Sequence, residues 1–205
     1  MLTKLKQKVQ GMLAIEAKAA HSIGLTPNRI SGLGIVLALF AALSYTKWQD
    51  QPFYLPVAIV LLLASGFCDA LDGVVARLYQ QTTAFGGFLD SMLDRYADAT
   101  VYVAIIISGL CDPLWGTVAL IGSLLVSYSR ARAEAANVRM ESVGIAERAE
   151  RIIILAVATV IAIFWQPATV INAAMILLAI LTNLTVVQRG IYAYGKLRKR
   201  KLTEN

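Results

Sequence analysis

The sequence contains few charged residues for a protein of its length. Of its 205 residues, 16% are Asp, Glu, Lys or Arg, whereas soluble domains contain about 25%. Hydrophobic residues make up 58% of the chain, and the mean hydropathy is +0.64. The apolar residues form long blocks rather than short amphipathic stripes. This pattern excludes an ordinary soluble domain and predicts an integral membrane protein.

Cysteine and histidine are also scarce. Cys68 and Cys111 have neither CxxC spacing nor a nearby histidine, so we expect packing residues rather than a disulfide or a metal site. His21 is the only histidine, and we expect it at the membrane surface rather than as a ligand. The amino-terminal segment lacks the unbroken apolar core of a cleavable signal peptide. Its apolar residues recur at helical spacing, which predicts an amphipathic surface helix within residues 1–22.

Six apolar segments are candidates for membrane crossing, because a spanning helix needs about 20 mostly apolar residues. Proline-containing turns separate several of them. We therefore expect an all-α integral membrane protein with six transmembrane helices in a single domain. The bundle would occupy residues 26–192, followed by a basic tail at 193–205. Arg189, just before the tail, belongs to the same group of basic residues. The expected helices are residues 30–45, 54–79, 84–110, 113–134, 147–165 and 168–192.

The basic residues indicate an orientation in the cell membrane. Lys and Arg are rare in translocated loops. Here the amino-terminal segment, the connection between the fourth and fifth helices and the tail are rich in them, whereas the opposite loops contain Lys47 alone. Both termini and the connection between the second and third helices should face the cytoplasm. The net charge of +6 then favours membrane lipids and phosphorylated substrates as partners, and no nucleic acid.

Four aspartates flank the connection between the second and third helices. Asp69 and Asp72 share one helix face, and so do Asp90 and Asp94, because residues three or four apart are neighbours on a helix. In an antiparallel hairpin the four carboxylates would meet roughly 15 Å from the turn. So many anions in an apolar setting require cations. Oxygen ligands favour Mg²⁺ or Mn²⁺, and four carboxylates could hold two ions that share a ligand.

The stretch from Asp69 to Asp94 also carries a family signature. It reads D-x2-D-G-x2-A-R-x8-G-x3-D-x3-D and resembles that of the CDP-alcohol phosphotransferases at every fixed position. The resemblance implies a homodimeric six-helix enzyme that transfers a lipid group from CDP-diacylglycerol or CDP-archaeol to an alcohol and releases CMP. It implies that the four aspartates bind two metal ions and that Asp94 is the general base. The positions that it assigns to CDP-lipid binding are Asn28, Arg29, Ile30, Ser31, Gly73, Arg77 and Thr83.

Basic residues at the cytoplasmic ends of the fourth and fifth helices suggest an acceptor that bears a phosphate. The two stretches around them, residues 127–134 and 144–151, resemble those of bacterial phosphatidylinositol-phosphate synthases and their archaeal counterparts. That resemblance implies inositol 1-phosphate as the acceptor. The implied contacts are Arg130, Arg132, Arg148 and Arg151.

Three alternatives remain open at this point. Glycerol 3-phosphate would also require arginines, which would make the protein a phosphatidylglycerophosphate synthase. Each arginine taken singly could instead be an ordinary cytoplasmic anchor of its helix. A cation or proton transporter could use the same aspartates, but it would need carboxylates near mid-bilayer, whereas here they cluster toward one face.

Overall fold

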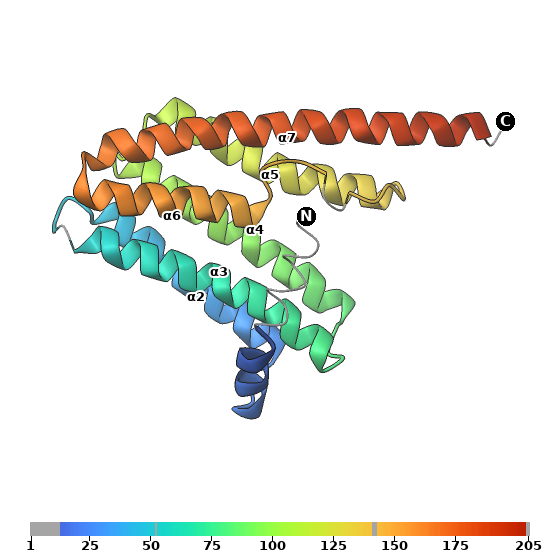
Figure 1. The fold of residues 1–205 in the computed structure, drawn as a ribbon, viewed down its shortest axis with the longest axis horizontal. Helices are drawn as coiled ribbons and strands as arrows, with labels where there is room; N and C mark the ends of the chain where they lie inside the picture. Colours follow the sequence, from blue (N-terminus) through green and yellow to red (C-terminus); the bar gives the residue numbers. More distant parts are fainter. Residues whose placement is uncertain (1–12, 52, 141–142, 204–205) are drawn as a thin grey trace.

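The computed structural model describes residues 13–51, 53–140 and 143–203, and within these ranges the chain is helical and contains no strand. A short helix spans residues 13–22; the expected surface helix also includes residues 1–12, which lie outside the described part. Six longer helices follow (Figure 1). They are α2 (Pro27–Thr46), α3 (Tyr54–Leu78), α4 (Ala84–Ile107), α5 (Pro113–Ala135), α6 (Arg148–Phe164) and α7 (Pro167–Thr203).

Local start signals explain where these helices begin. Pro27 and Pro113 occupy the first turns of α2 and α5, where the missing N–H of proline is not needed. Thr83 caps α4, since its hydroxyl oxygen accepts the Gly86 backbone N–H at 2.9 Å. Asp112 caps α5 in the same way. Because these signals are local, the helices α2 to α6 begin and end within three residues of the predicted bounds.

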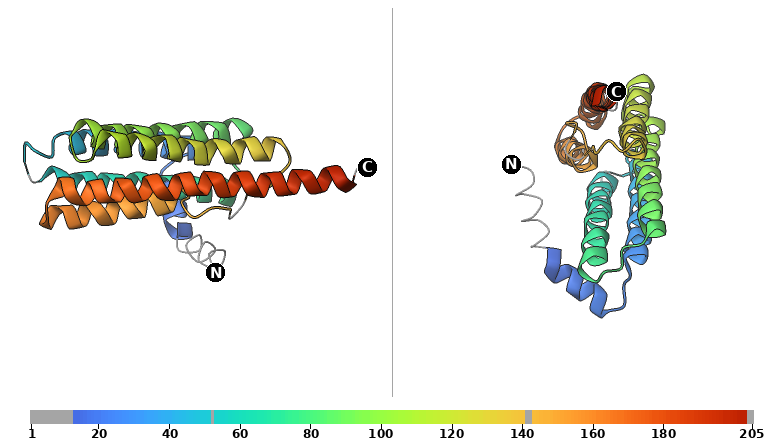
Figure 2. Two further views of the ribbon diagram at one scale, coloured as in Figure 1. Left: turned by 90° about the horizontal axis from the view of Figure 1, so that it is seen from above. Right: turned by 90° about the vertical axis from the view of Figure 1, so that its right-hand side faces the viewer.

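The last helix is longer than expected. The predicted span ends at residue 192, where the apolar sequence gives way to basic residues, but α7 continues to Thr203. Loss of hydrophobicity marks where a helix leaves a membrane, not where its backbone hydrogen bonds stop. The residues expected as a basic tail therefore extend α7 beyond the other helices (Figure 2).

The helices pack side by side as a bundle (Figures 1 and 2). Helix α2 packs against α3 and α4, α5 packs against α4 and α7, and α6 packs against α3 and α7. The main core draws on all six. One buried residue from each helix in turn is Tyr45, Leu55, Ile105, Ala119, Leu155 and Met175.

A second core cluster fastens the short helix at residues 13–22. Its Ala17 and Ala20 are buried with Ile30 of α2 and with apolar residues of α3 such as Val75. The His21 ring stacks on Tyr79 just beyond α3, with ring centroids 3.5 Å apart. This helix thus packs on the end of the α2–α3 pair through a narrow apolar face.

The chain is a membrane protein. Helices α2, α3 and α7 are long and apolar enough to cross a bilayer on length and composition alone. Large apolar side chains cover their outer faces, among them Phe40, Val60 and Ile180, which are 54%, 65% and 55% exposed. Such extensive exposed apolar surface is stable against lipid rather than water.

Candidate active site

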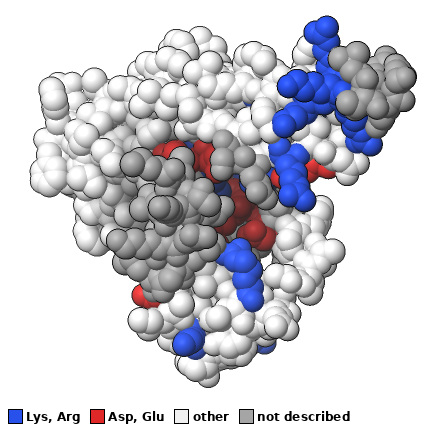
Figure 3. Space-filling model, turned by 45° about the vertical axis from the view of Figure 1, so that its right-hand side comes forward, with Lys and Arg blue, Asp and Glu red and all other residues white. Residues whose placement is uncertain are grey.

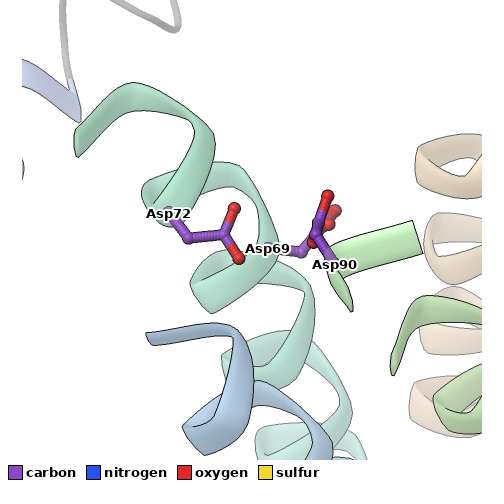
Figure 4. A group of neighbouring side chains, drawn as sticks. All are labelled: Asp69, Asp72 and Asp90. Carbon is purple, nitrogen blue, oxygen red and sulfur yellow. The ribbon is translucent and has the colours of Figure 1, made fainter. Parts of the chain in front are cut away.

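Three of the predicted metal-ligand aspartates converge between α3 and α4. Asp69 and Asp72 lie on α3 and Asp90 lies on α4, and one carboxylate oxygen from each falls within 4.8 Å of the others. The Asp72 side chain points toward the other two (Figure 4). The helical spacing on α3 and the hairpin between the two helices thus bring these groups together as the sequence predicted.

Helix α2 contributes a hydroxyl to this group. The Ser31 hydroxyl donates to Asp72 Oδ2, and the Asp72 residue is only 4% exposed. Ser31 lies there because α2 and α3 approach closely: a Cβ added at Gly34 would lie 3.3 Å from the Cys68 Cβ. Ser31, one of the residues expected to contact the CDP-lipid, is thus also a partner of a carboxylate.

The fourth aspartate is joined to the group through an arginine. Arg148, the first residue of α6, places its Nη1 atom 2.6 Å from Asp94 Oδ1 and 2.7 Å from Asp69 Oδ2. Asp94 also lies 4.0 Å from Arg95. Its carboxylate also approaches that of Asp69 and lines the same small cavity as the other three aspartates, so the four carboxylates gather in one place with Arg148 between Asp69 and Asp94.

A fifth aspartate extends the site. Asp98, one helical turn beyond Asp94, lies 3.3 Å from Arg148 Nε and 2.6 Å from Arg151 Nη2. Arg151 is 4% exposed and also donates to the Ala146 carbonyl at 3.1 Å. Asp98 lies outside the family signature, but its helical spacing from Asp94 places it on the same face of α4.

Several residues expected to bind the CDP-lipid surround the outer end of the α3–α4 hairpin. The Arg77 guanidinium lies over Gly73, where a Cβ would come within 3.4 Å of Nη1. Asn28 Oδ1 would lie 3.2 Å from a Cβ added at Gly86, in the first turn of α4 that Thr83 caps. The α2 start, the α3 end and the α4 start therefore share one region of the surface.

Two other members of that expected group have partners within the chain. The Ile30 side chain is 1% exposed and packs in the second core cluster, so its side chain is not available to a ligand. Arg29 donates from Nη1 to the Gly24 carbonyl at 3.1 Å.

The remaining arginines have different surroundings. Arg130 pairs with Glu134 at 2.9 Å on the exposed face of α5, and Arg132 is exposed in the last turn of that helix. Arg189 was expected among the basic residues of the carboxyl-terminal region but is only 2% exposed. It donates to the carbonyls of Val126 and Val143 and thereby holds the segment that leads into α6. No sequence signal separates it from the surface arginines around it.

The charges of the site are segregated on one face of the molecule. Acidic side chains gather near the centre of that face, and basic side chains lie beside them and toward the end of α7 (Figure 3). A small cavity of about 10 Å³ is lined by the carboxylates, Ser31 and Arg148. Converging carboxylate oxygens with no nitrogen or sulfur donor among them fit a hard divalent cation such as Mg²⁺ or Mn²⁺.

Comparison with known proteins agrees with this geometry. The model of the CDP-alcohol phosphatidyltransferase family matches residues 24–187, which include every helix that contributes to the site. The chain belongs to this family. It is accordingly a membrane transferase of phospholipid synthesis, and the family's dependence on divalent metal fits the carboxylate cluster.

Similar members of the CDP-alcohol phosphatidyltransferase family come from archaea and bacteria. The archaetidylinositol phosphate synthase of Pyrococcus horikoshii is 38% identical over 96% of this chain and 98% of its own length. The phosphatidylinositol phosphate synthase of Mycolicibacterium smegmatis is 33% identical over 84% of this chain and 79% of its own length.

Solved structures show the same fold. The phosphatidylinositol phosphate synthase of Mycobacterium tuberculosis with CDP-DAG bound has a TM-score of 0.74 and 30% identity, over 89% of this chain and 93% of that one. The same enzyme in complex with manganese and citrate has a TM-score of 0.74 and 29% identity, over 89% and 88%.

Proposed function

We propose that this protein transfers a phosphatidyl or archaetidyl group from a CDP-lipid to a hydroxyl of inositol 1-phosphate and releases CMP. The observation that supports it most is the junction of the carboxylate cluster with Arg148. That junction places a guanidinium, which suits a phosphate-bearing acceptor, beside carboxylates that suit a metal-bound diphosphate. The similar archaeal and mycobacterial synthases favour the inositol-phosphate acceptor.

The chain's own groups divide between the two substrates. Asp69, Asp72 and Asp90 would hold divalent metal, with Asp94 completing the set, and the bound metal would neutralise the diphosphate and polarise the reacting oxygen. Arg77 above Gly73 is the candidate for binding the cytidine diphosphate. Further contacts to this part of the substrate are proposed from the segment at residues 28–31 and from Thr83.

Asp94 is the proposed general base. Its carboxylate accepts the proton of the acceptor hydroxyl, whose oxygen forms a bond to the lipid-side phosphorus. The bond between that phosphorus and the bridging oxygen breaks, and CMP leaves with the electron pair. In the structure Arg148 holds Asp94 Oδ1, which orients the carboxylate.

The charge balance supports two metal ions. The five carboxylates of the network face three guanidinium groups, those of Arg95, Arg148 and Arg151, which leaves an excess of two negative charges. One divalent cation would only neutralise the site. Two would leave two positive charges, which favours binding of both the diphosphate and a phosphorylated acceptor.

Arg148 is the proposed contact for the phosphate of the acceptor, because it lies beside Asp94 and keeps one-sixth of its side chain exposed, 17%. Arg130 and Arg132 at the exposed end of α5 would complete the phosphate site. Arg151 is more deeply buried, with only 4% of its side chain exposed.

The same proposal includes a membrane arrangement. We propose that all six helices α2 to α7 cross the membrane as one domain, with both termini and the active site on the cytoplasmic side, and that the protein forms a homodimer. The positive-inside distribution of Lys and Arg supports this orientation. Cysteine-scanning accessibility in intact cells would test the topology, and light scattering in detergent would test the dimer.

The activity is tested by CMP release from CDP-diacylglycerol or CDP-archaeol with Mg²⁺, with inositol 1-phosphate, glycerol 3-phosphate, inositol and serine compared as acceptors. Inositol 1-phosphate should support release, and Asp94→Asn should abolish it. Asp50→Asn is the matched control, since Asp50 is an exposed carboxylate that pairs with Lys47 between α2 and α3. Release with glycerol 3-phosphate alone would overturn the acceptor, and no release with any acceptor would overturn the transferase activity proposed here.

A further inference from the structure

We propose that Asp98 is a positioning residue that holds Arg148 in the orientation in which it binds the acceptor phosphate, and that Arg151 acts by fixing Asp98. This inference rests on the proposed function. It assigns a role to a carboxylate outside the family signature and changes the expected role of Arg151 from a substrate contact to a support.

The Asp98 carboxylate is shared between two arginines. Its Oδ1 atom faces Arg148 Nε at 3.3 Å, and its Oδ2 atom faces Arg151 Nη2 at 2.6 Å. The Asp98 side chain is 13% exposed. A buried carboxylate that serves two guanidinium groups fixes the direction of each, because an arginine fork offers its donors in one plane.

Asp98 and the other two aspartates contact different atoms of the Arg148 guanidinium. Asp98 faces its Nε atom, while Nη1 lies within 2.7 Å of both Asp69 and Asp94. Those two aspartates are candidate metal ligands, and bound cations weaken their attraction for a guanidinium. Asp98 is not a candidate ligand, so its hold on Arg148 persists when metal and substrate enter. The Nη atoms of Arg148 then remain directed toward the reaction centre beside Asp69 and Asp94.

Arg151 is buried more deeply than Arg148 and has partners within the chain. It is 4% exposed, whereas the Arg148 side chain is 17% exposed. Its Nη1 donates to the Ala146 carbonyl at 3.1 Å and its Nη2 binds Asp98. An arginine with these internal partners and so little exposure cannot also present its fork to a phosphate. It connects Asp98 to the backbone at the start of α6.

The test uses full-length enzyme and the variants Asp98→Asn and Asp98→Glu, with Asp50→Asn as the matched carboxylate control. Asp98→Asn keeps the size of the side chain but replaces one acceptor oxygen with a donor NH₂ that faces a guanidinium. We expect the KM for inositol 1-phosphate to rise by about 10- to 100-fold, as loss of a hydrogen bond between charged groups would cause. In the same variant, the KM for CDP-lipid should change by less than about threefold. Asp98→Glu, which keeps the carboxylate, should raise the KM for inositol 1-phosphate less than Asp98→Asn does.

Two further measurements separate positioning from simple structural support. Direct titration of inositol 1-phosphate into the enzyme, without CDP-lipid, should show the same loss of affinity in Asp98→Asn. In an Arg148→Lys background, Asp98→Asn should add little, because the residue through which Asp98 acts has already changed. If Asp98 only supports the fold, Asp98→Asn should lower thermal stability and change both KM values together. Its effect should then add to that of Arg148→Lys.

The outcomes distinguish a failure of the positioning role from a failure of the proposed function. If wild type binds and uses inositol 1-phosphate but Asp98→Asn has the same KM as wild type, the positioning role is wrong and the proposed function stands. If wild type uses glycerol 3-phosphate instead, the KM comparison is made with that acceptor, since both bear a phosphate. If wild type uses neither, the proposed function is wrong and the positioning role for a phosphate acceptor is wrong with it.

Discussion

The hydroxyl of Ser31 should control the affinity of the site for metal. Ser31→Ala removes the donor to Asp72 Oδ2 and leaves a carboxylate that is 4% exposed with one partner fewer. A hydrogen bond to a charged group contributes about 1.5–3 kcal/mol. The same hydroxyl also faces the Pro27 carbonyl at 3.1 Å, so its single proton is shared. The lower part of the range, about 1.5–2 kcal/mol, corresponds to roughly a 10- to 30-fold change in binding.

We therefore expect Ser31→Ala to raise the Mg²⁺ concentration for half-maximal CMP release by about 10- to 30-fold, with most of the maximal rate recovered at saturating metal. Binding of Mn²⁺ followed by electron paramagnetic resonance should weaken by a similar factor. Ser31→Thr keeps the hydroxyl and should lie between wild type and Ser31→Ala.

Ser44→Ala on the same helix is the matched control for this experiment. Ser44 is 6% exposed and Ser31 is 9% exposed, but the Ser44 hydroxyl donates at 2.8 Å to the Phe40 carbonyl of its own helix. Its removal should leave the metal dependence unchanged. If Ser31→Ala and Ser44→Ala had the same Mg²⁺ dependence, the Ser31 hydroxyl would not support metal binding by Asp72. If Ser31→Ala changed only the KM for CDP-lipid, the Ser31 hydroxyl would act through the substrate alone.

Two other expectations concern stability and reactivity. Gly122→Ala should lower the free energy of unfolding by about 1–3 kcal/mol, because the new Cβ would lie 2.2 Å from Thr182 Oγ1 between α5 and α7. Gly190→Ala is the control, since no atom lies within 4 Å of its new Cβ. Equal thermal unfolding of the two variants in detergent would contradict this packing. Burial raises the pKa of the Cys111 thiol to about 11, and the neighbouring Asp112 contributes to this rise. At pH 8 a maleimide should therefore modify Cys111 in denatured but not in native protein. Rapid labelling of native protein at Cys111, located by mass spectrometry, would contradict this expectation.

The helices were predictable from sequence because their boundaries depend on local chemistry. Pro113 after Asp112 starts a helix in any surroundings, and the apolar blocks define where the chain can be buried. The clustering of Asp69, Asp72 and Asp90 was also predictable, since it follows from helical spacing and a hairpin. These inferences need no knowledge of how distant helices pack.

The way in which α6 directs its arginines toward α4 was not predictable in the same way. Whether Arg148 faces Asp94 and Asp98 or the lipid surface depends on the rotation of α6 about its axis, which is set by packing against α3 and α7. The buried state of Arg189 likewise depends on the segment that crosses over it. In both cases the sequence shows only a basic residue near the end of an apolar segment, a pattern shared by ordinary cytoplasmic anchors.

One local conflict in the sequence does point to the role of α6. Arg148 and Arg151 lie in its first turn, where the partial positive charge of the helix N-terminus disfavours cations by about 0.3–1 kcal/mol each. A helix chosen for stability alone would carry acidic residues there, as α6 does at Glu150, rather than an arginine on each side of that glutamate. The structure resolves the conflict, because Asp69, Asp94 and Asp98 from other helices surround these guanidinium groups. Local rules tend to be broken at functional sites, so two arginines opening an apolar helix are evidence for a site that the helix itself does not contain.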